Sequence, residues 1–197
     1  MQEKAAPDEG EPRKEKLLMK HLTPRDLTLS ALFTAVTAVL SQIVIPMPLV
    51  PFNLAVLAVF LCGALQKKGA ALLSQLGYLL LGAAGVPVFA QFTAGPATLF
   101  GVTGGYLMAY PVMAWLVAWL VEKDGWGSFW GRIGAMAVSL IPCYLFGTVW
   151  FAVYLHESFA NAALAACLPF IPADLAKAFA ASYVSLAVQQ RMKGAAA

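Results

Sequence analysis

The sequence predicts an all-α integral membrane protein, a six-transmembrane-helix bundle with both termini cytoplasmic. Composition is the first reason, because 60% of the 197 residues are hydrophobic, 12% are charged and the mean hydropathy is +0.74. Soluble domains carry about 25% charged residues. The other two reasons are long apolar stretches and basic residues that recur only at alternate connections. The length suits about six spans of about 20 residues plus loops.

Residues 1–26 are polar and mixed in charge. We expect residues 1 to about 15 to be disordered, because they have too little apolar side-chain area to form a core. The apolar run that follows is too long for a signal peptide and lacks a small-residue cleavage site.

Six apolar stretches are predicted to be membrane spans. Thr23 and Pro24 form a favourable start for the first, as N-cap and first helical residue. Pro111 and Pro142 lie inside the fourth and fifth spans and should kink them, which a bundle tolerates where neighbours satisfy the freed carbonyls. The spans are residues 27–45, 52–66, 69–85, 104–121, 132–155 and 171–190, which make a membrane domain 27–190 followed by a cytoplasmic tail 191–197.

Basic residues alternate with the spans. Connections 46–51, 86–103 and 156–170 contain no Lys or Arg. The positive-inside rule therefore predicts six spans with both termini in the cytoplasm. The connections that do contain basic residues have Arg13, Lys14, Lys16, Lys20 and Arg25 among those before the first span, Lys67 and Lys68 after the second, Lys123 and Arg132 around the fourth connection, and Arg191 and Lys193 after the last span.

The uncharged connection 86–103 is rich in Gly, Pro, Thr and Phe. It is too apolar for a solvated linker and too interrupted for a spanning helix. Irregular backbone persists near a membrane only where it packs in protein or lines a cavity. Gly101, Gly104 and Gly105 allow tight turns and close approach of backbone to a ligand. The segment either folds over helix ends or forms a lid over an outward-facing site.

Asp174 and Lys177 lie three residues apart in the sixth predicted span and so share a helical face. Lys177 is the one basic residue of thirteen that lies inside an apolar stretch. Ionisable residues within a membrane are costly and by default indicate a functional site. The pair is either an intrahelical ion pair whose lysine reaches outward, or a polar site facing the bundle interior. An interior site would suit a small ligand with N–H donors and an anionic or carbonyl acceptor.

Other polar side chains at the outer ends of the spans are candidates for the same pocket. Each of them could instead make a structural hydrogen bond to a broken helix end. The candidates are Asn53, Gln91, Thr93, Thr103, Tyr106 and Tyr144.

Ala31 and Ala35 form a small-xxx-small motif, which lets helices approach closely. It predicts either internal packing or a docking face for another membrane protein. The sequence has no GxxxxGK[ST] phosphate loop, no GxSxG, no HExxH and no His/Cys cluster. We therefore expect no metal, no cofactor and no enzyme activity. A binding protein that takes its energy from a partner fits better, and the positions of the basic residues do not suggest nucleic acid.

Three stretches together resemble the BioY family, the biotin-specific S components of energy-coupling factor (ECF) transporters. They are LGYLLLGAAGVPVFA at 76–90, LFGVTGGYL at 99–107 and LPFIPADLAKA at 168–178. The resemblance runs from about residue 27 to 190. Many members read GPTGGYL where this chain has Val102 in place of the proline.

This resemblance implies a subunit in the plasma membrane of a prokaryote that captures biotin from outside with high affinity. The subunit would deliver biotin for ATP-driven uptake with a separate ECF module of a transmembrane coupling protein and two ATPase subunits. Ala31 and Ala35 would face the coupling protein, and Asp174 and Lys177 match the Asp and Lys of the family's biotin site. The alternatives are an S component for another small vitamin and an integral-membrane enzyme that uses Asp174 and Lys177.

Biotin also suits the residues themselves. Its ureido ring has two N–H donors and one strong acceptor, and its tail ends in a carboxylate. Asp174 can accept from a ureido N–H, and Lys177 can donate either to the ureido oxygen or to the tail carboxylate. The thiophane ring and tail would rest on apolar walls such as Phe89, Phe92 and Tyr106.

Overall fold

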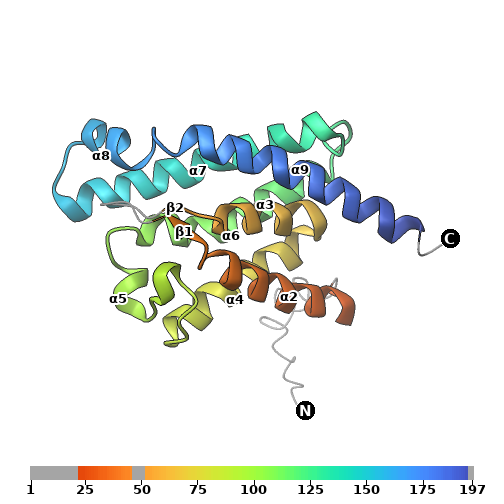
Figure 1. The fold of residues 1–197 in the computed structure, drawn as a ribbon, viewed down its shortest axis with the longest axis horizontal. Helices are drawn as coiled ribbons and strands as arrows, with labels where there is room; N and C mark the ends of the chain where they lie inside the picture. Colours follow the sequence, from red (N-terminus) through yellow and green to blue (C-terminus); the bar gives the residue numbers. More distant parts are fainter. Residues whose placement is uncertain (1–21, 46–51, 195–197) are drawn as a thin grey trace, which may run out of the picture.

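The computed structural model describes residues 22–45 and 52–194, and most of them are helical (Figure 1). The long helices are α2 (Pro24–Leu40), α3 (Ala55–Leu65), α4 (Lys68–Ala83), α6 (Gly104–Val121), α7 (Phe129–Leu155) and α9 (Ile171–Gly194). The short elements are β1 (Val44–Ile45), β2 (Phe52–Asn53), the 3-10 helix η1 (Ala90–Phe92), α5 (Pro96–Leu99) and α8 (Phe159–Ala166).

Each predicted span contains one helix of 11 residues or more, and two spans differ from their predicted bounds at the ladder between them. Phe52 and Asn53, predicted to begin the second span, form strand β2, and α3 begins only at Ala55. α2 ends at Leu40, and Val44 and Ile45 form strand β1 instead of a last helical turn. β1 pairs antiparallel with β2, so that Ile45 lies opposite Phe52. This ladder joins the end of α2 to the start of α3. Pro46 and Pro48, predicted to end the first span, lie outside the described residues.

Three of the long helices are long and apolar enough to cross a membrane. They are Gly104–Val121, Phe129–Leu155 and the Ile171–Met192 part of α9, with mean hydropathies of 1.5, 1.8 and 1.2. α2, α3 and α4 have 17, 11 and 16 residues and are shorter. The three long apolar helices mark the chain as a membrane protein.

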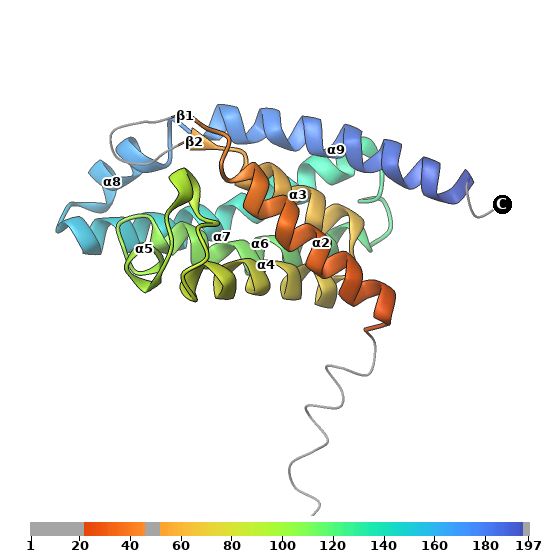
Figure 2. The ribbon, with the colours of Figure 1, turned by 60° about the horizontal axis from the view of Figure 1, so that its bottom comes forward.

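The helices form one bundle with α6 at its centre. α6 packs against α3, α4 and α7, while α2 packs against α3 and α4, and α9 against α3 and α7. In Figure 1, α7 and α9 lie along one side, α2 and α4 along the other, and α3 and α6 between them. The start of α2 and the last turn of α9 lie at the same end of the bundle, and α5 and α8 lie at the opposite end (Figure 2).

The face of α2 that points into the bundle is lined with hydroxyl groups. Ser30 donates to the carbonyl of Ala70 at 3.0 Å, and Thr34 donates to the carbonyl of Ser74 at 2.7 Å. Large apolar side chains of the same helix, among them Leu32, are exposed. Small polar residues inside and large apolar residues outside are typical of a helix that faces lipid, where hydroxyl groups bond neighbouring helices.

The start of α2 follows its prediction. Thr23 caps the helix, Pro24 is its first residue, and Asp26 completes a capping box with Thr23. The Asp26 carboxylate also pairs with Lys67 at 2.9 Å. Hydrogen bonds from the Thr23 backbone N–H and from Lys67 lower the pKa of Asp26 to about 2. The Asp26 carboxylate is therefore ionised at neutral pH, and its contact with Lys67 ties α2 to the turn between α3 and α4.

Arg132 is buried inside α7, although the sequence predicted it at the edge of a cytoplasmic loop. Its guanidinium donates to the carbonyl of Gly127 at 3.0 Å, to Ser185 at 2.8 Å and to Gln189. Gln189 in turn donates to the carbonyl of Ala64 at 3.4 Å. The network joins α3, α7 and α9, so Arg132 holds these helices together.

Candidate functional site

A cavity of about 300 Å³ lies between the segment 89–103, α6, α7 and the start of α9. Small-molecule sites in proteins typically have volumes of about 300–1,000 Å³. The walls combine aromatic and aliphatic side chains with a few polar groups, which is the usual composition of a site for a small organic ligand. Residues that were not predicted as ligand contacts also line it: Val56, Ala90, Thr98, Val102, Leu107, Tyr110, Cys143, Ala166 and Phe170.

Asp174 and Lys177 form the polar centre of this cavity. The Lys177 ammonium donates to Asp174 Oδ1 at 2.8 Å, and both residues are buried. The Tyr144 hydroxyl donates to Asp174 Oδ2 at 2.6 Å. The carboxylate lies in the first turn of α9, where the helix dipole favours a negative charge. The two residues therefore form an intrahelical ion pair that faces the bundle interior. The alternative prediction, in which the lysine side chain reaches outward, is wrong.

A carboxylate oxygen has two lone pairs, and an ammonium has three N–H donors. Each Asp174 oxygen uses one lone pair on a protein donor, and Lys177 uses one donor on Asp174. Both residues thus keep hydrogen-bonding capacity for a ligand. A buried centre with one strong acceptor and one strong donor suits a ligand group that carries N–H and C=O side by side.

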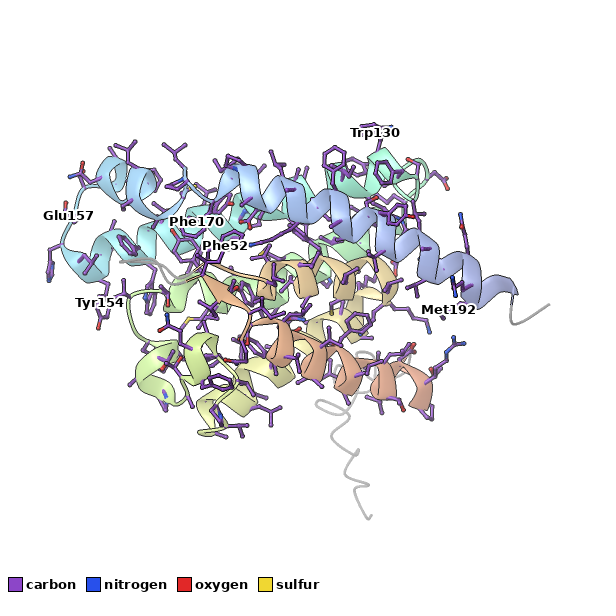
Figure 3. All side chains as sticks on the ribbon, viewed as in Figure 1. Phe52, Trp130, Tyr154, Glu157, Phe170 and Met192 are labelled. Carbon is purple, nitrogen blue, oxygen red and sulfur yellow. The ribbon has the colours of Figure 1, made fainter. Side chains whose placement is uncertain are left out.

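Aromatic rings cover the lysine. Lys177 Nζ lies 4.0 Å from the centroid of the Phe52 ring, and Phe52 stacks with Phe170 at 6.3 Å between centroids. Figure 3 shows Phe52 and Phe170 next to one another near the start of α9. Sequence reasoning missed Phe52, because an aromatic residue after a proline looks like any other apolar contact.

The segment 86–103 forms one wall of the cavity, with short helical turns in place of extended backbone. Gln91 and Phe92 both have left-handed backbone, with φ of 59° and 56°. Such conformations are costly for non-glycine residues and persist where surrounding contacts fix them. Here Gln42 provides these contacts: its amide nitrogen donates to the carbonyls of Val88 and Phe89, each at 3.0 Å, and its amide oxygen accepts from the Phe92 N–H at 2.9 Å.

Nine of the eleven predicted ligand residues line the cavity. Two of them also make hydrogen bonds within the protein: Asn53 accepts from the Ala55 N–H at 3.0 Å, and Tyr106 bonds Thr148 at 3.2 Å. These two residues combine the structural and lining roles that the sequence left open. The nine are Asn53, Phe89, Gln91, Thr93, Thr103, Tyr106, Tyr144, Asp174 and Lys177.

Phe92 and Gly104 do not line the cavity. Phe92 is 69% exposed, because its left-handed backbone turns the side chain away from the wall that Phe89 forms. Gly104 is buried, and a Cβ there would lie 2.0 Å from the carbonyl oxygen of Leu99. This glycine therefore allows the segment before α6 to fold back onto the helix start.

Ala31 and Ala35 are both exposed on α2. Internal packing, one of the two predictions for this motif, is wrong for the described residues. The same described part of the chain contains no group of three or more His, Cys, Asp or Glu side chains that could hold a metal ion.

Gly147 fixes the position of Tyr106 from behind. An added Cβ at Gly147 would lie 2.2 Å from the Tyr106 ring, whose other side lines the cavity. We expect Gly147→Ala to push this ring into the cavity and to lower ligand affinity by about tenfold or more, which corresponds to about 1.4 kcal/mol. Ligand titration of the purified variant measures this. Gly127→Ala, where an added Cβ has 3.8 Å of space, is the matched control, and equal losses in both variants would contradict the argument.

Gln42 is the contact that holds the cavity wall. We expect Gln42→Leu to free the left-handed turn at 91–92 and to lower ligand affinity by about three- to tenfold, since ordering a loop on binding costs free energy. Proteolysis of the ligand-free protein should cut the 86–95 region faster than in the unchanged protein. The control is Ile43→Ala at the exposed neighbour. Unchanged affinity and unchanged cleavage in Gln42→Leu would remove Gln42 from this role.

Comparisons with known proteins agree with the geometry. The model of the BioY family matches residues 13–194. The chain is 35% identical to the biotin transporter BioY2 of Lactococcus lactis, over 82% of this chain and 88% of that protein. It is 35% identical to a probable biotin transporter BioY of Pyrococcus horikoshii (84% and 96% covered) and 34% identical to the biotin transporter BioY of Thermotoga maritima (84% and 96%).

The fold agrees as well. A crystal structure at 2.1 Å of the S-component for biotin from an ECF-type ABC transporter superposes with a TM-score of 0.77 at 21% identity, covering 92% of this chain and 95% of that one. The match establishes the same fold, and the sequence relatives establish descent. The chain belongs to the BioY family.

Proposed function

We propose that this chain is the substrate-capturing membrane subunit of a biotin uptake system, a transport protein and not an enzyme. It would bind biotin from the outside with high affinity and deliver it for ATP-driven uptake with a separate ECF module of a transmembrane coupling protein and two ATPase subunits. The observation that carries the proposal is the buried Asp174–Lys177 pair inside a cavity of about 300 Å³ in a member of the BioY family. The named functions of its relatives supply the ligand.

The proposed site comprises the nine predicted residues that line the cavity. Asp174 accepts a ureido N–H, and Lys177 donates to the ureido oxygen or to the tail carboxylate of biotin. Phe89 and Tyr106 provide apolar wall for the thiophane ring and tail. A site that hydrogen-bonds a buried polar ring rejects analogues without those groups, because its own polar groups would stay unpaired.

The proposed topology has six spans in the plasma membrane of a prokaryote, with a polar cytoplasmic N-terminus 1–26, a membrane domain 27–190 and a cytoplasmic tail 191–197. The start of α2 and the last turn of α9 lie at one end of the bundle, which supports the placement of both termini on one side of the membrane (Figure 2). The exposed Ala31 and Ala35 on α2 are the proposed contact with the coupling protein, because small residues allow a partner helix to approach closely.

Calorimetric titration of biotin into the purified, detergent-solubilised chain tests the proposal, with lipoate, thiamine and riboflavin as comparison ligands. Tight one-to-one binding of biotin alone is the expected result. Binding of another vitamin in preference to biotin would assign the cavity to that ligand. Absence of biotin binding by protein that unfolds cooperatively on heating would refute the proposed ligand.

A further inference from the structure

The ring of Phe52 meets the charged end of Lys177. Lys177 Nζ lies 4.0 Å from the ring centroid, and the lysine is 7% exposed. A cation within about 6 Å of an aromatic face is attracted by the negative potential of that face, more strongly where water is excluded. Asp174 accepts one hydrogen bond from the ammonium, and the ring is the second group that compensates the burial of this charge.

The position of the ring is fixed by its backbone and by a neighbouring side chain. Phe52 lies in β2, directly opposite Ile45 in the short antiparallel ladder. Its ring stacks with that of Phe170 at 6.3 Å, with 20° between the planes, and Phe170 is itself buried and lines the cavity. The ring is therefore held next to the lysine and does not merely lie close to it by chance.

A lysine near the end of a helix bundle can adopt another side-chain conformation, in which its ammonium does not face the interior. Its four-carbon stem can carry the ammonium outward to water while the stem stays on apolar surface. Lys177 lies two turns from the start of α9, yet its ammonium points inward to Asp174 and Phe52. Of its three N–H donors, one is used on Asp174 and one side of the ammonium faces the ring. Within residues 22–45 and 52–194, no other hydrogen-bond acceptor contacts the ammonium, so the remaining direction can serve a ligand atom.

We propose that Phe52 is a positioning residue, whose ring holds the Lys177 ammonium in the cavity and thereby presents one free N–H donor to the ligand. This inference rests on the proposed function, in which Lys177 contacts the bound ligand. Without the ring, the ammonium moves outward in the free protein, and binding has to draw it back. Affinity falls even though Phe52 donates no hydrogen bond.

Fluorination of the ring tests the proposal, because ring fluorines withdraw electron density from the aromatic face and change its size little. Phe52 is replaced, by site-specific incorporation, with phenylalanine carrying one, two or three ring fluorines. Phe52→Leu removes the aromatic face, and Phe52→Trp retains it. The same fluorinated residues at Phe179, an exposed aromatic on α9 that contacts Phe129 and Trp130, are the matched control.

The first readout needs no ligand. The detergent-solubilised chain is treated briefly with an acetylating reagent, and acetylation of each lysine is measured by mass spectrometry. We expect acetylation of Lys177 to rise stepwise with fluorination and in Phe52→Leu, and to stay low in Phe52→Trp. Lys68, exposed in the structure, is the internal reference and should not change.

The second readout is the affinity for biotin, which should fall stepwise, by about fivefold for the trifluorinated ring. Equal Lys177 acetylation across the Phe52 series would overturn the proposal, whatever the affinities are. If the unchanged chain fails to bind biotin, the proposed function is refuted, while acetylation still decides whether Phe52 holds Lys177. Changes of the same size in Lys177 acetylation and biotin affinity in the Phe179 series would also overturn the proposal. They would show that the changes do not arise from the contact between Phe52 and Lys177.

Discussion

Asp174→Asn is expected to lower the affinity for biotin by at least tenfold, which requires a loss of only about 1.4 kcal/mol. The amide has nearly the shape of the carboxylate but has no charge and one acceptor in place of two. It leaves the Lys177 ammonium buried without its counter-charge, and it removes the acceptor proposed for a ureido N–H. One of the two oxygens bonded by Tyr144 and Lys177 becomes an N–H₂ group, so the amide oxygen is left to accept from Lys177 while the Tyr144 hydroxyl has to change from donor to acceptor.

The matched control is Asp26→Asn. Asp26 is also a carboxylate paired with a lysine, at 2.9 Å from Lys67, but it belongs to the helix cap of α2 and does not line the cavity. We expect this variant to lose some thermal stability and to keep its affinity for biotin. Titration of both variants by calorimetry measures the difference. Full affinity in Asp174→Asn would remove Asp174 from the ligand site.

Lys177→Met is expected to have the largest effect on stability. The methionine roughly fills the volume of the lysine stem, but it leaves the Asp174 carboxylate buried without a cation. Removing one partner of a buried ion pair typically costs about 3–5 kcal/mol, whereas replacing both partners by groups without charge is often nearly neutral. The double variant Asp174→Asn, Lys177→Met should therefore unfold at a higher temperature than Lys177→Met alone, although all three variants bind biotin poorly.

The expected recovery of stability in the double variant, without recovery of biotin binding, separates the two roles of the pair. Thermal unfolding in detergent gives the interaction between the two residues as a double-mutant cycle, and titration gives the affinities. Lys67→Met is the control for the loss of a lysine, because Lys67 is largely exposed and its pair with Asp26 lies outside the cavity. Additive losses of stability at positions 174 and 177 would show that the pair is not coupled, in contradiction to the 2.8 Å contact.

Much of the fold follows from sequence. Each apolar stretch contains one helix that fills most of it, and Thr23 with Pro24 starts the first, because capping and hydrophobic length act locally. The end of α2 differs from its prediction because it depends on a contact with another segment and not on local sequence. Val44 and Ile45 are as apolar as a helix end, but pairing of Ile45 with Phe52 draws them into a strand. Pairing with a distant segment is invisible in local composition.

Some residues of the candidate site could be predicted from the sequence and others could not. Asp174 and Lys177 could be identified because charged residues in an apolar stretch are rare and costly. Phe52, Gln42 and Gly147 could not, because their importance comes from neighbours 125, 50 and 41 residues away: Lys177, Phe92 and Tyr106. None of these residues is unusual in its own stretch of sequence.

The sequence by itself determined that the chain is a helical membrane protein with one polar pair where apolar residues are expected. The cost of placing charge in a low-dielectric medium depends on residue type and hydrophobic context, and both are written in the sequence. Only the tertiary structure decided that the pair faces inward, that Tyr144 and Phe52 complete its surroundings, and that Phe92 and Gly104 stand outside the cavity. These outcomes depend on backbone conformation and on contacts between distant segments, which form only when the helices pack together.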